Sequence, residues 1–180
     1  GLGDVYKRQG GNLVSAAPDT ERTASAIGEV ELVVHVSTKP NRSHLIPTNG
    51  DVLILPCLGR TEIDLQNGSP QFVTVENSMG IVHRSQGRLD PASKDLRSEP
   101  WIVAEIAARS IGDECIDWRG LAQNYDGIRD LIEASIAGFD AYNERVRSPM
   151  GFELPNPPRD NAEFDTASGL AEFTLHDLPD

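Results

Sequence analysis

Two short apolar runs in the first half of the chain have the pattern of buried β-strands. Glu31 to Val36 (ELVVHV) and Asp51 to Leu55 (DVLIL) are nearly continuous aliphatic stretches rich in β-branched residues. About 14 residues separate them, which is enough for a crossover between parallel neighbours. Four residues are therefore predicted to lie in adjacent parallel strands, buried between helix layers: Val33, Val34, Val52 and Ile54.

Helical periodicity appears in three places. A helix is predicted from Asp19, which can act as its N-terminal cap, to Gly28, a typical C-terminal stop. Ser98-Glu99-Pro100 is a strong helix start, and apolar residues then recur on one face up to Gly112. A further helix is predicted from Asp126 to Gly138. Strand and helix signals that alternate in this way are typical of an α/β layer with a mostly parallel sheet.

The remaining segments complete the predicted organisation. Phe72 to Glu76 (FVTVE) alternates apolar and polar residues and is a third strand candidate. After Ser148 four prolines and four acidic residues up to Asp165 indicate a linker, and Leu170 to Leu175 (LAEFTL) is predicted to open a new strand. Residues 1–9 (GLGDVYKRQ) look like a translated sequencing-adapter scar and are left out of the fold.

Composition and charge narrow the function classes. The chain has 28 acidic and 16 basic residues and a net charge of −12, which argues against nucleic acid as a partner. No apolar run reaches the length of a membrane span. Cys57 and Cys115 are too few and too far apart for a CxxC metal site or a disulfide framework, so we expect a reducing, cytoplasmic environment. A signal peptide before the start of the chain remains the alternative.

Three segments that leave predicted strands carry small or polar residues. They are Gly10-Gly11-Asn12, His35 to Ser43, and Cys57 to Arg60. In parallel α/β sheets, ligands bind beyond the carboxyl ends of the strands, where glycines let backbone N–H groups approach a phosphate. Two adjacent glycines also occur for turn geometry alone, so this pattern does not by itself assign a site.

Three further residues or pairs have competing interpretations. Cys57 is predicted to be a buried small hydrophobe rather than a nucleophile, because no spacing ties His44 or His83 to it. The pair His83-Arg84 is either an anion contact or a solvated loop. Glu99 can accept two hydrogen bonds from a guanine, or it can simply be a favourable charge at a helix N-terminus.

The order of these segments resembles the large subunits of molybdopterin oxidoreductases, in the formate-dehydrogenase-alpha-like bacterial branch. The resemblance covers nearly all of Gly10 to Pro179. It rests on six stretches in sequence order: GGN with PDTERT, ELVVHVSTKPNRSH, DVLILPCLGRTEID, VTVENSMGIVHRSQGRL, SEPWIVAEIAARSIG and FDTASGLAEF.

The resemblance implies a fold and a cofactor. Residues 10–148 would be the C-terminal part of an α/β domain that binds bis-molybdopterin guanine dinucleotide. Residues 149–180 would be an acidic, proline-rich linker and the first strand of a β-barrel domain that is largely absent. A 4Fe-4S cluster, its cysteines and the molybdenum ligand would lie upstream of the chain, so the chain alone would not turn over substrate. The cofactor would carry the redox chemistry.

The same resemblance implies the cofactor-binding residues. Relatives often have an aspartate in the second strand-end loop, which this chain lacks at Val36 and Ser37. Glu99 stands where relatives place an acidic residue on the guanine. The residues that match the family's cofactor loops are Gly11, Asn12, His35, Ser37, Glu62 and Glu99, and they are predicted to converge on one side of the sheet.

Two functions remain open at this stage. The first is a molybdenum-dependent oxidoreductase that oxidises formate or a similar small molecule by two electrons and passes them to an electron-acceptor protein. The second is a structural homologue that kept the fold, lost the cofactor and acts as a subunit or scaffold. The missing aspartate favours the second function, whereas Asn12, Glu62 and Glu99 favour the first.

Overall fold

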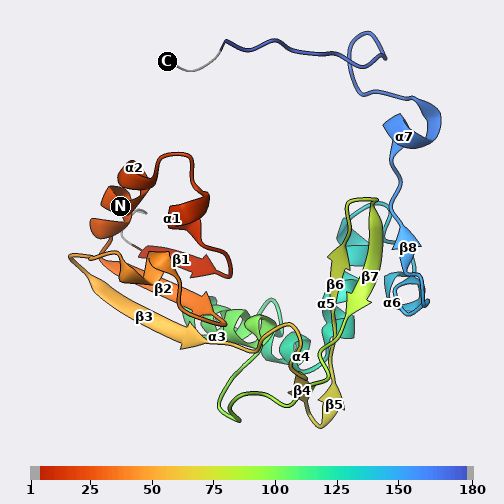
Figure 1. Cartoon of the computed structure of the whole chain (residues 1–180). Helices are drawn as coiled ribbons and strands as arrows, with labels where there is room; N and C mark the ends of the chain where they lie inside the picture. Colours follow the sequence, from red (N-terminus) through yellow and green to blue (C-terminus); the bar gives the residue numbers. More distant parts are fainter. Residues whose placement is uncertain (1–4, 178–180) are drawn as a thin grey trace. The chain divides into compact units, whose positions relative to one another are not determined.

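The structure, a computed structural model, describes residues 5–177 and divides them into two units (Figure 1). Unit 1 holds the described residues up to Val73 together with Ser85–Gly127. Unit 2 holds Thr74–Arg84 and the described residues from Ile128 onward. The boundary expected at residue 148 therefore falls inside unit 2. For residues 5–8 only the backbone is described.

Unit 1 is built on a three-stranded parallel sheet in the order β1-β2-β3. The strands are β1 (Val5–Gln9), β2 (Leu32–Ser37) and β3 (Asp51–Pro56). In β2 and β3, Val33 pairs with Val52 and His35 with Ile54, which confirms the predicted parallel neighbours. Strand β1 consists of residues that the sequence analysis left out of the fold, so their exclusion was wrong. Their interpretation as an adapter scar concerns origin and stays a prediction.

Helices cover β2 on both faces (Figure 1). Val33 packs with Val14 and Ile27, which belong to α1 (Leu13–Ala16) and α2 (Thr20–Gly28). Val36, on the opposite face, packs with Cys57 and with Ile102 of α3 (Glu99–Ile111). The predicted starts of α2 and α3 are confirmed. Asp19 accepts a bond from the Arg22 N–H, and Ser98 accepts one from the Trp101 N–H.

Strand β3 departs from the prediction. Val52, Leu53 and Ile54 are 46%, 47% and 48% exposed, although we expected Val52 and Ile54 to be buried. β3 is the end strand of the sheet, and the described helices pack on β2 instead. The aliphatic run at Asp51 to Leu55 correctly predicted a strand. Such a run does not indicate whether helices cover that strand in the folded chain.

Short elements complete unit 1. A 3-10 helix, η1 (Arg42–Leu45), lies in the connection between β2 and β3. Strands β4 (Leu65–Gln66) and β5 (Ser69–Pro70) form a hairpin, and α4 (Trp118–Gln123) follows α3. The helix expected from Asp126 to Gly138 is α5 (Tyr125–Ser135), and its residues from Ile128 belong to unit 2.

Unit 2 contains a second small sheet in the order β6-β7-β8. The third predicted strand is β6 (Val73–Glu76), and it pairs in this sheet rather than in the parallel one. β7 (Ile81–Ser85) runs antiparallel to β8 (Phe152–Glu153). The helices are α6 (Tyr142–Arg145) and α7 (Pro157–Asn161). Part of the predicted linker is thus regular structure.

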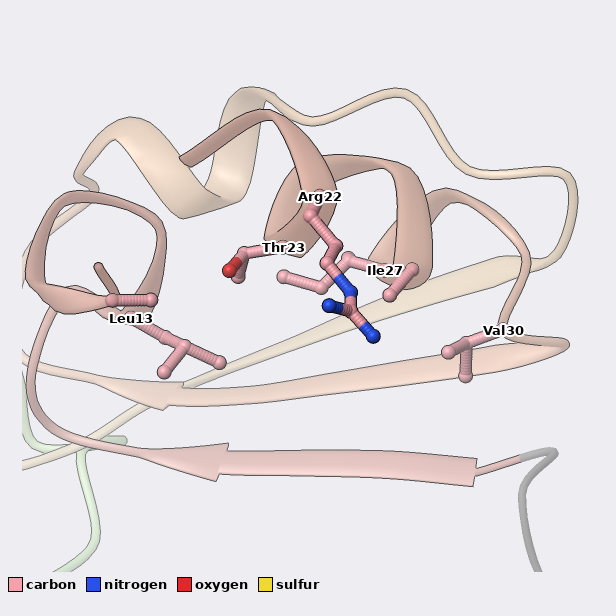
Figure 2. A pocket seen from close by; sticks show the side chains of 7 residues that line it. Leu13, Arg22, Thr23, Ile27 and Val30 are labelled. Carbon is pink, nitrogen blue, oxygen red and sulfur yellow. The ribbon is translucent and has the colours of Figure 1, made fainter. Parts of the chain in front are cut away.

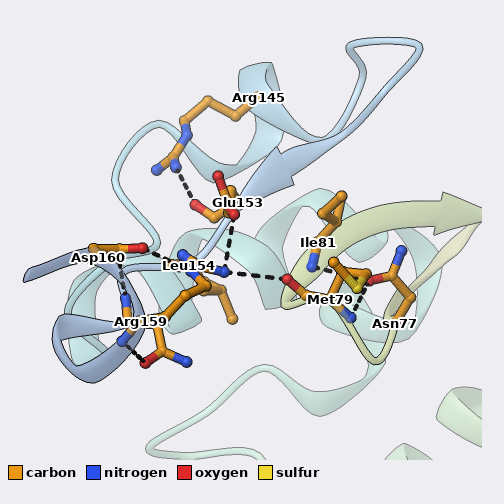
Figure 3. A network of polar contacts seen from close by, with 9 residues as sticks. Asn77, Met79, Ile81, Arg145, Glu153, Leu154, Arg159 and Asp160 are labelled. Atoms are coloured by element: carbon orange, nitrogen blue, oxygen red, sulfur yellow. Dashed lines mark hydrogen bonds and ion pairs between the residues drawn. The ribbon is translucent and has the colours of Figure 1, made fainter. Parts of the chain in front are cut away.

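An arginine network holds the C-terminal part of unit 2 (Figure 3). Arg145 lies 4.0 Å from the ring centre of Phe152 and donates to the backbone oxygen of Glu153. Arg159 pairs with the Glu153 carboxylate at 2.9 Å and donates to the backbone oxygen of Met79 at 3.2 Å. These contacts hold β8 next to β7, although four helices, α3 to α6, lie between the two strands in sequence.

The strand predicted from Leu170 to Leu175 does not form. Leu170, Phe173 and Leu175 are 67%, 93% and 97% exposed. A strand needs a neighbour for its backbone N–H and C=O groups, and the described part of the chain provides none there.

Candidate functional site

The carboxyl end of the parallel sheet brings three chain segments together. Beyond the last paired residues, the Gly10 N–H donates to the Val36 carbonyl at 3.0 Å and the Cys57 N–H donates to the Ser37 carbonyl at 3.1 Å. We use the name carboxyl end for Gly10–Asn12, Ser37 and Cys57, which follow or close β1, β2 and β3. Parallel topology is the cause, since every strand ends on the same side.

Gly10 and Gly11 form the loop after β1. Both have positive φ angles, +61° and +59°, which L-residues with side chains rarely adopt. A Cβ on Gly11 would meet no atom within 4 Å among the described residues, so the loop is open on that side. The Asn41 side chain donates to the Gly11 carbonyl at 3.1 Å. The conformation of this loop thus requires the two glycines, and the loop leaves part of its backbone open to a ligand.

Asn12 is half-buried, and its side chain holds this loop in place through two hydrogen bonds. Its side-chain oxygen accepts from the Ser43 hydroxyl at 2.9 Å, and its amide nitrogen donates to Ser15 at 3.0 Å. Asn41 and Ser43, which sequence reasoning did not single out, therefore position the predicted residues Gly11 and Asn12. Both lie inside the polar stretch His35 to Ser43 that stood out in the sequence.

Ser37 and His35 lie on the same face of β2 but in different surroundings. The Ser37 side chain is 6% exposed, and its hydroxyl has no hydrogen-bond partner among the described residues. His35 is 2% exposed, and its ring stacks on that of His44 with centres 4.3 Å apart. Ser37 thus keeps an unused hydroxyl at the carboxyl end, whereas the His35 ring is part of the packing beneath it.

Glu62 is engaged with the backbone. Its carboxylate accepts from the Gly59 N–H and, at 2.6 Å, from the Ala92 N–H. These two bonds, that of Gly59 first, lower the pKa of Glu62. The side chain closes the loop after β3 and ties it to the segment before α3. Its main role in this geometry is structural.

Cys57 is buried, as predicted, with 2% of its surface exposed. Burial, and then the negative charges of Glu99 and Glu62, raise its pKa from 9.0 to about 11. A thiol in such surroundings stays protonated near neutral pH, which opposes a nucleophilic role. The same effect indicates that both carboxylates lie near the end of β3.

Glu99 reaches the carboxyl end from the first turn of α3. Its Oε1 lies 3.9 Å from the position that a Cβ on Gly10 would take. Glu99 is half-buried and accepts no hydrogen bond from the described residues. Glu99 therefore lies next to Gly10, in the loop that also holds Gly11 and Asn12. Because a free carboxylate accepts two parallel N–H bonds, this group can recognise a ligand with two adjacent donors.

Hollows also lie elsewhere in unit 1, outside the carboxyl end. A mainly aliphatic pocket of about 390 Å³ opens between α1, α2 and the sheet, with Leu13, Ile27 and Val30 around it (Figure 2). Arg22 and Thr23 are its polar lining residues. A second hollow of about 370 Å³ lies beside the loop after β3, and a third of about 290 Å³ lies between that loop and Trp101.

Neither a metal-ligand cluster nor a membrane-spanning helix is present in residues 5–177. No three or more His, Cys, Asp and Glu side chains of this region are grouped so that they could hold a metal ion. None of its helices has both the length and the apolar character that a membrane crossing requires.

Comparison with known proteins finds relatives along nearly the whole chain. The chain is 47% identical over 175 residues, 97% of its length, to an uncharacterized oxidoreductase of Mycobacterium tuberculosis and to one of Mycobacterium bovis. It is 44% identical over 171 residues, 91% of its length, to protein YdeP of Escherichia coli. No protein-family model matches the chain.

The chain spans only 22% of the length of these relatives. It is thus similar to a part of larger proteins, of which the mycobacterial ones carry the name oxidoreductase.

Proposed function

We propose that this chain is part of an oxidoreductase of the molybdopterin type, and that its carboxyl end binds the guanosine part of a molybdopterin guanine dinucleotide. The observation that carries the proposal is the free carboxylate of Glu99 beside the Gly10–Gly11 loop. The names of the mycobacterial relatives support the oxidoreductase class. The order of sequence segments described above supports the cofactor.

The described residues fit such a cofactor in three respects. Glu99 can accept from the ring N–H and the exocyclic amine of guanine. Ser37 offers a buried hydroxyl without a partner, suited to a ribose or a phosphate oxygen. Because no atom of the described residues lies near the open side of Gly11, the backbone of this loop can come close to a bulky ligand. When bound, the dinucleotide would supply two-electron redox chemistry at molybdenum.

The residues of this chain would bind and orient the ligand in this proposal. Asn12 would act indirectly, because it holds the glycine loop in place through Ser43. Glu62 would fix the loop after β3, and His35 would pack beneath Ser37. The formate-like substrate, the 4Fe-4S cluster and the electron-acceptor partner belong to the same proposal for the whole protein.

A scaffold without cofactor is the second candidate. The engagement of Asn12 and Glu62 in contacts within the chain favours it, because a binding side chain normally keeps its polar atoms free for the ligand. The Ser37 hydroxyl favours the first candidate, because a buried polar group without a partner in residues 5–177 is explained by a ligand. The half-buried carboxylate of Glu99, which accepts no hydrogen bond from the described residues, favours it as well.

The test is the cofactor content of the full-length protein. Glu99→Ala is expected to weaken cofactor retention by about 1–3 kcal/mol, the cost of leaving donors of the guanine unpaired. Molybdenum and released guanine nucleotide are measured in the purified variant and in the parent. Glu21→Ala is the control, because Glu21 is also an acidic residue in the first turn of a helix but is exposed on α2.

Equal occupancy in the parent and in Glu99→Ala would leave Glu99 as a helix-start charge. A parent protein without molybdenum or guanine nucleotide would favour the scaffold.

A further inference from the structure

The hollow beside the loop after β3 carries positive charge in an otherwise acidic chain. It measures about 370 Å³ and is lined by Arg60 and Arg88 together with Thr61, Ser85, Gln86, Gly87 and Leu89. The two guanidinium groups come from segments more than twenty residues apart in sequence. The chain has 28 acidic and 16 basic residues, so arginines that remain without a carboxylate stand out.

Neither arginine forms an ion pair within the described residues. Arg60 donates from Nε to the Ser85 hydroxyl at 3.0 Å, and no contact of the Arg88 guanidinium is found there. The carboxylate of the neighbouring Glu62 is engaged with the backbone, since it accepts from the N–H groups of Gly59 and Ala92. Asp90 forms no ion pair with either arginine in residues 5–177. Two like charges on one hollow repel each other, and a bound anion would remove this cost.

Backbone contacts hold the two segments together. The N–H groups of Arg88 and Leu89 donate to the Thr61 carbonyl at 2.8 and 2.9 Å. The backbone of Gly87 lies so close to that of Glu62 that a Cβ at Gly87 would overlap the Glu62 backbone. The positions of both arginines in the hollow are thus set by the fold.

Hydroxyl groups complete the donor set. The Ser85 oxygen already accepts from Arg60, so its own proton is free to be donated. The Thr61 hydroxyl makes no hydrogen bond within the described residues. Two guanidinium forks and two hydroxyls match the oxygens of a tetrahedral oxyanion, because arginine binds phosphate oxygens with two parallel bonds.

We propose that this hollow, lined by Arg60, Thr61, Ser85 and Arg88, is a binding site for a phosphate group carried by a small molecule. The volume of about 370 Å³ lies at the lower end of small-molecule pockets, which range over about 300–1,000 Å³, so it leaves room for more than the phosphate itself. The inference does not depend on the proposed function, because none of its residues takes part in the argument for guanine recognition by Glu99.

The test uses inorganic phosphate as the minimal probe. The 180-residue chain is titrated at constant ionic strength and followed by amide chemical shifts, with chloride as the reference anion. We expect saturable shifts at Ser85–Arg88 and a dissociation constant raised about tenfold or more by Arg60→Gln and by Arg88→Gln. Arg22→Gln is the control, since it removes the same charge from the exposed arginine on α2. Far-UV circular dichroism checks that all variants fold.

Shifts that do not saturate, or that weaken equally in Arg22→Gln, would overturn the proposal. A second titration with GDP identifies the source of the phosphate. If GDP displaces inorganic phosphate equally well from the parent and from Glu99→Gln, the site takes phosphates independently of guanine. If Glu99→Gln abolishes the displacement, the hollow binds the phosphate of the same nucleotide whose guanine is bound by Glu99. Phosphate binding without GDP binding would count against the proposed function and leave this site standing.

Discussion

Tyr125→Phe tests the buried polar network that joins α3, α5 and the loop after β3. The Tyr125 side chain is 2% exposed, and its hydroxyl donates to the Asp64 carboxylate at 2.5 Å. The same oxygen lies 2.6 Å from the hydroxyl of Ser98, the N-terminal cap of α3. Removing the hydroxyl takes one donor from a carboxylate and one acceptor from a buried serine.

The expected loss of unfolding free energy is about 2 kcal/mol. A hydrogen bond to a charged group contributes about 1.5–3 kcal/mol, and the serine bond adds to it. Asp64 is only half-buried, so water can replace part of what is lost. Urea unfolding is followed by far-UV circular dichroism, because Tyr125 belongs to unit 1 and Tyr142, the control residue, belongs to unit 2.

Tyr142→Phe is the matched control. Within residues 5–177 its hydroxyl bonds only the neutral hydroxyl of Thr74, at 2.7 Å, so the loss should be about 1 kcal/mol or less. A cost for Tyr125→Phe no larger than that of Tyr142→Phe would refute the reasoning. A double-mutant cycle with Ser98→Ala should show coupling of at least about 0.5 kcal/mol, as expected for residues in contact.

Three further predictions concern Cys57, Glu62 and Gly87. Thiol labelling near neutral pH should modify exposed Cys115 and spare Cys57 in the folded chain; rapid modification of both would contradict the burial of Cys57. The pKa of Glu62 is lowered on folding, so its contribution to stability is present above its ordinary pKa of 4.5 and is lost as the pH falls below it. The stability gap between the parent and Glu62→Gln should therefore shrink from about pH 6 to about pH 3, and a constant gap would count against the bonds of Glu62. Gly87→Ala should lower the unfolding temperature, because its Cβ would overlap the Glu62 backbone; an unchanged temperature would contradict that close approach.

Local sequence signals predicted those parts of the fold that depend on neighbouring residues. The β-branched runs of β2 and β3 and the start of α3 at Ser98-Glu99-Pro100 are of this kind. The exposure of Val52 and Ile54 was missed, because it depends on which layers cover the sheet. The strand predicted at Leu170 to Leu175 was wrong for the same reason, since a strand forms only where a partner is present.

The candidate site was predictable only in part. Parallel topology predicted that Ser37 lies at the carboxyl end of the sheet, whereas the assignment of Glu99 to the same end came from the family resemblance. The engagement of Asn12 with Ser43, and of Glu62 with Ala92, joins residues about thirty positions apart. No periodicity encodes such pairs, so the sequence alone could not separate binding side chains from those that hold the loops.

The most direct test of the central claim compares GDP with IDP on the 180-residue chain. Inosine lacks the exocyclic amine of guanine, so the two nucleotides differ in one of the two donors that Glu99 is proposed to accept. Calorimetric titration should show GDP binding about tenfold or more tightly than IDP, as expected for one hydrogen bond to a charged acceptor. The difference should vanish in Glu99→Ala, which removes both acceptor oxygens, and persist in Glu21→Ala. Equal affinities for GDP and IDP in the parent chain, or a preference that survives Glu99→Ala, would contradict guanine recognition by Glu99.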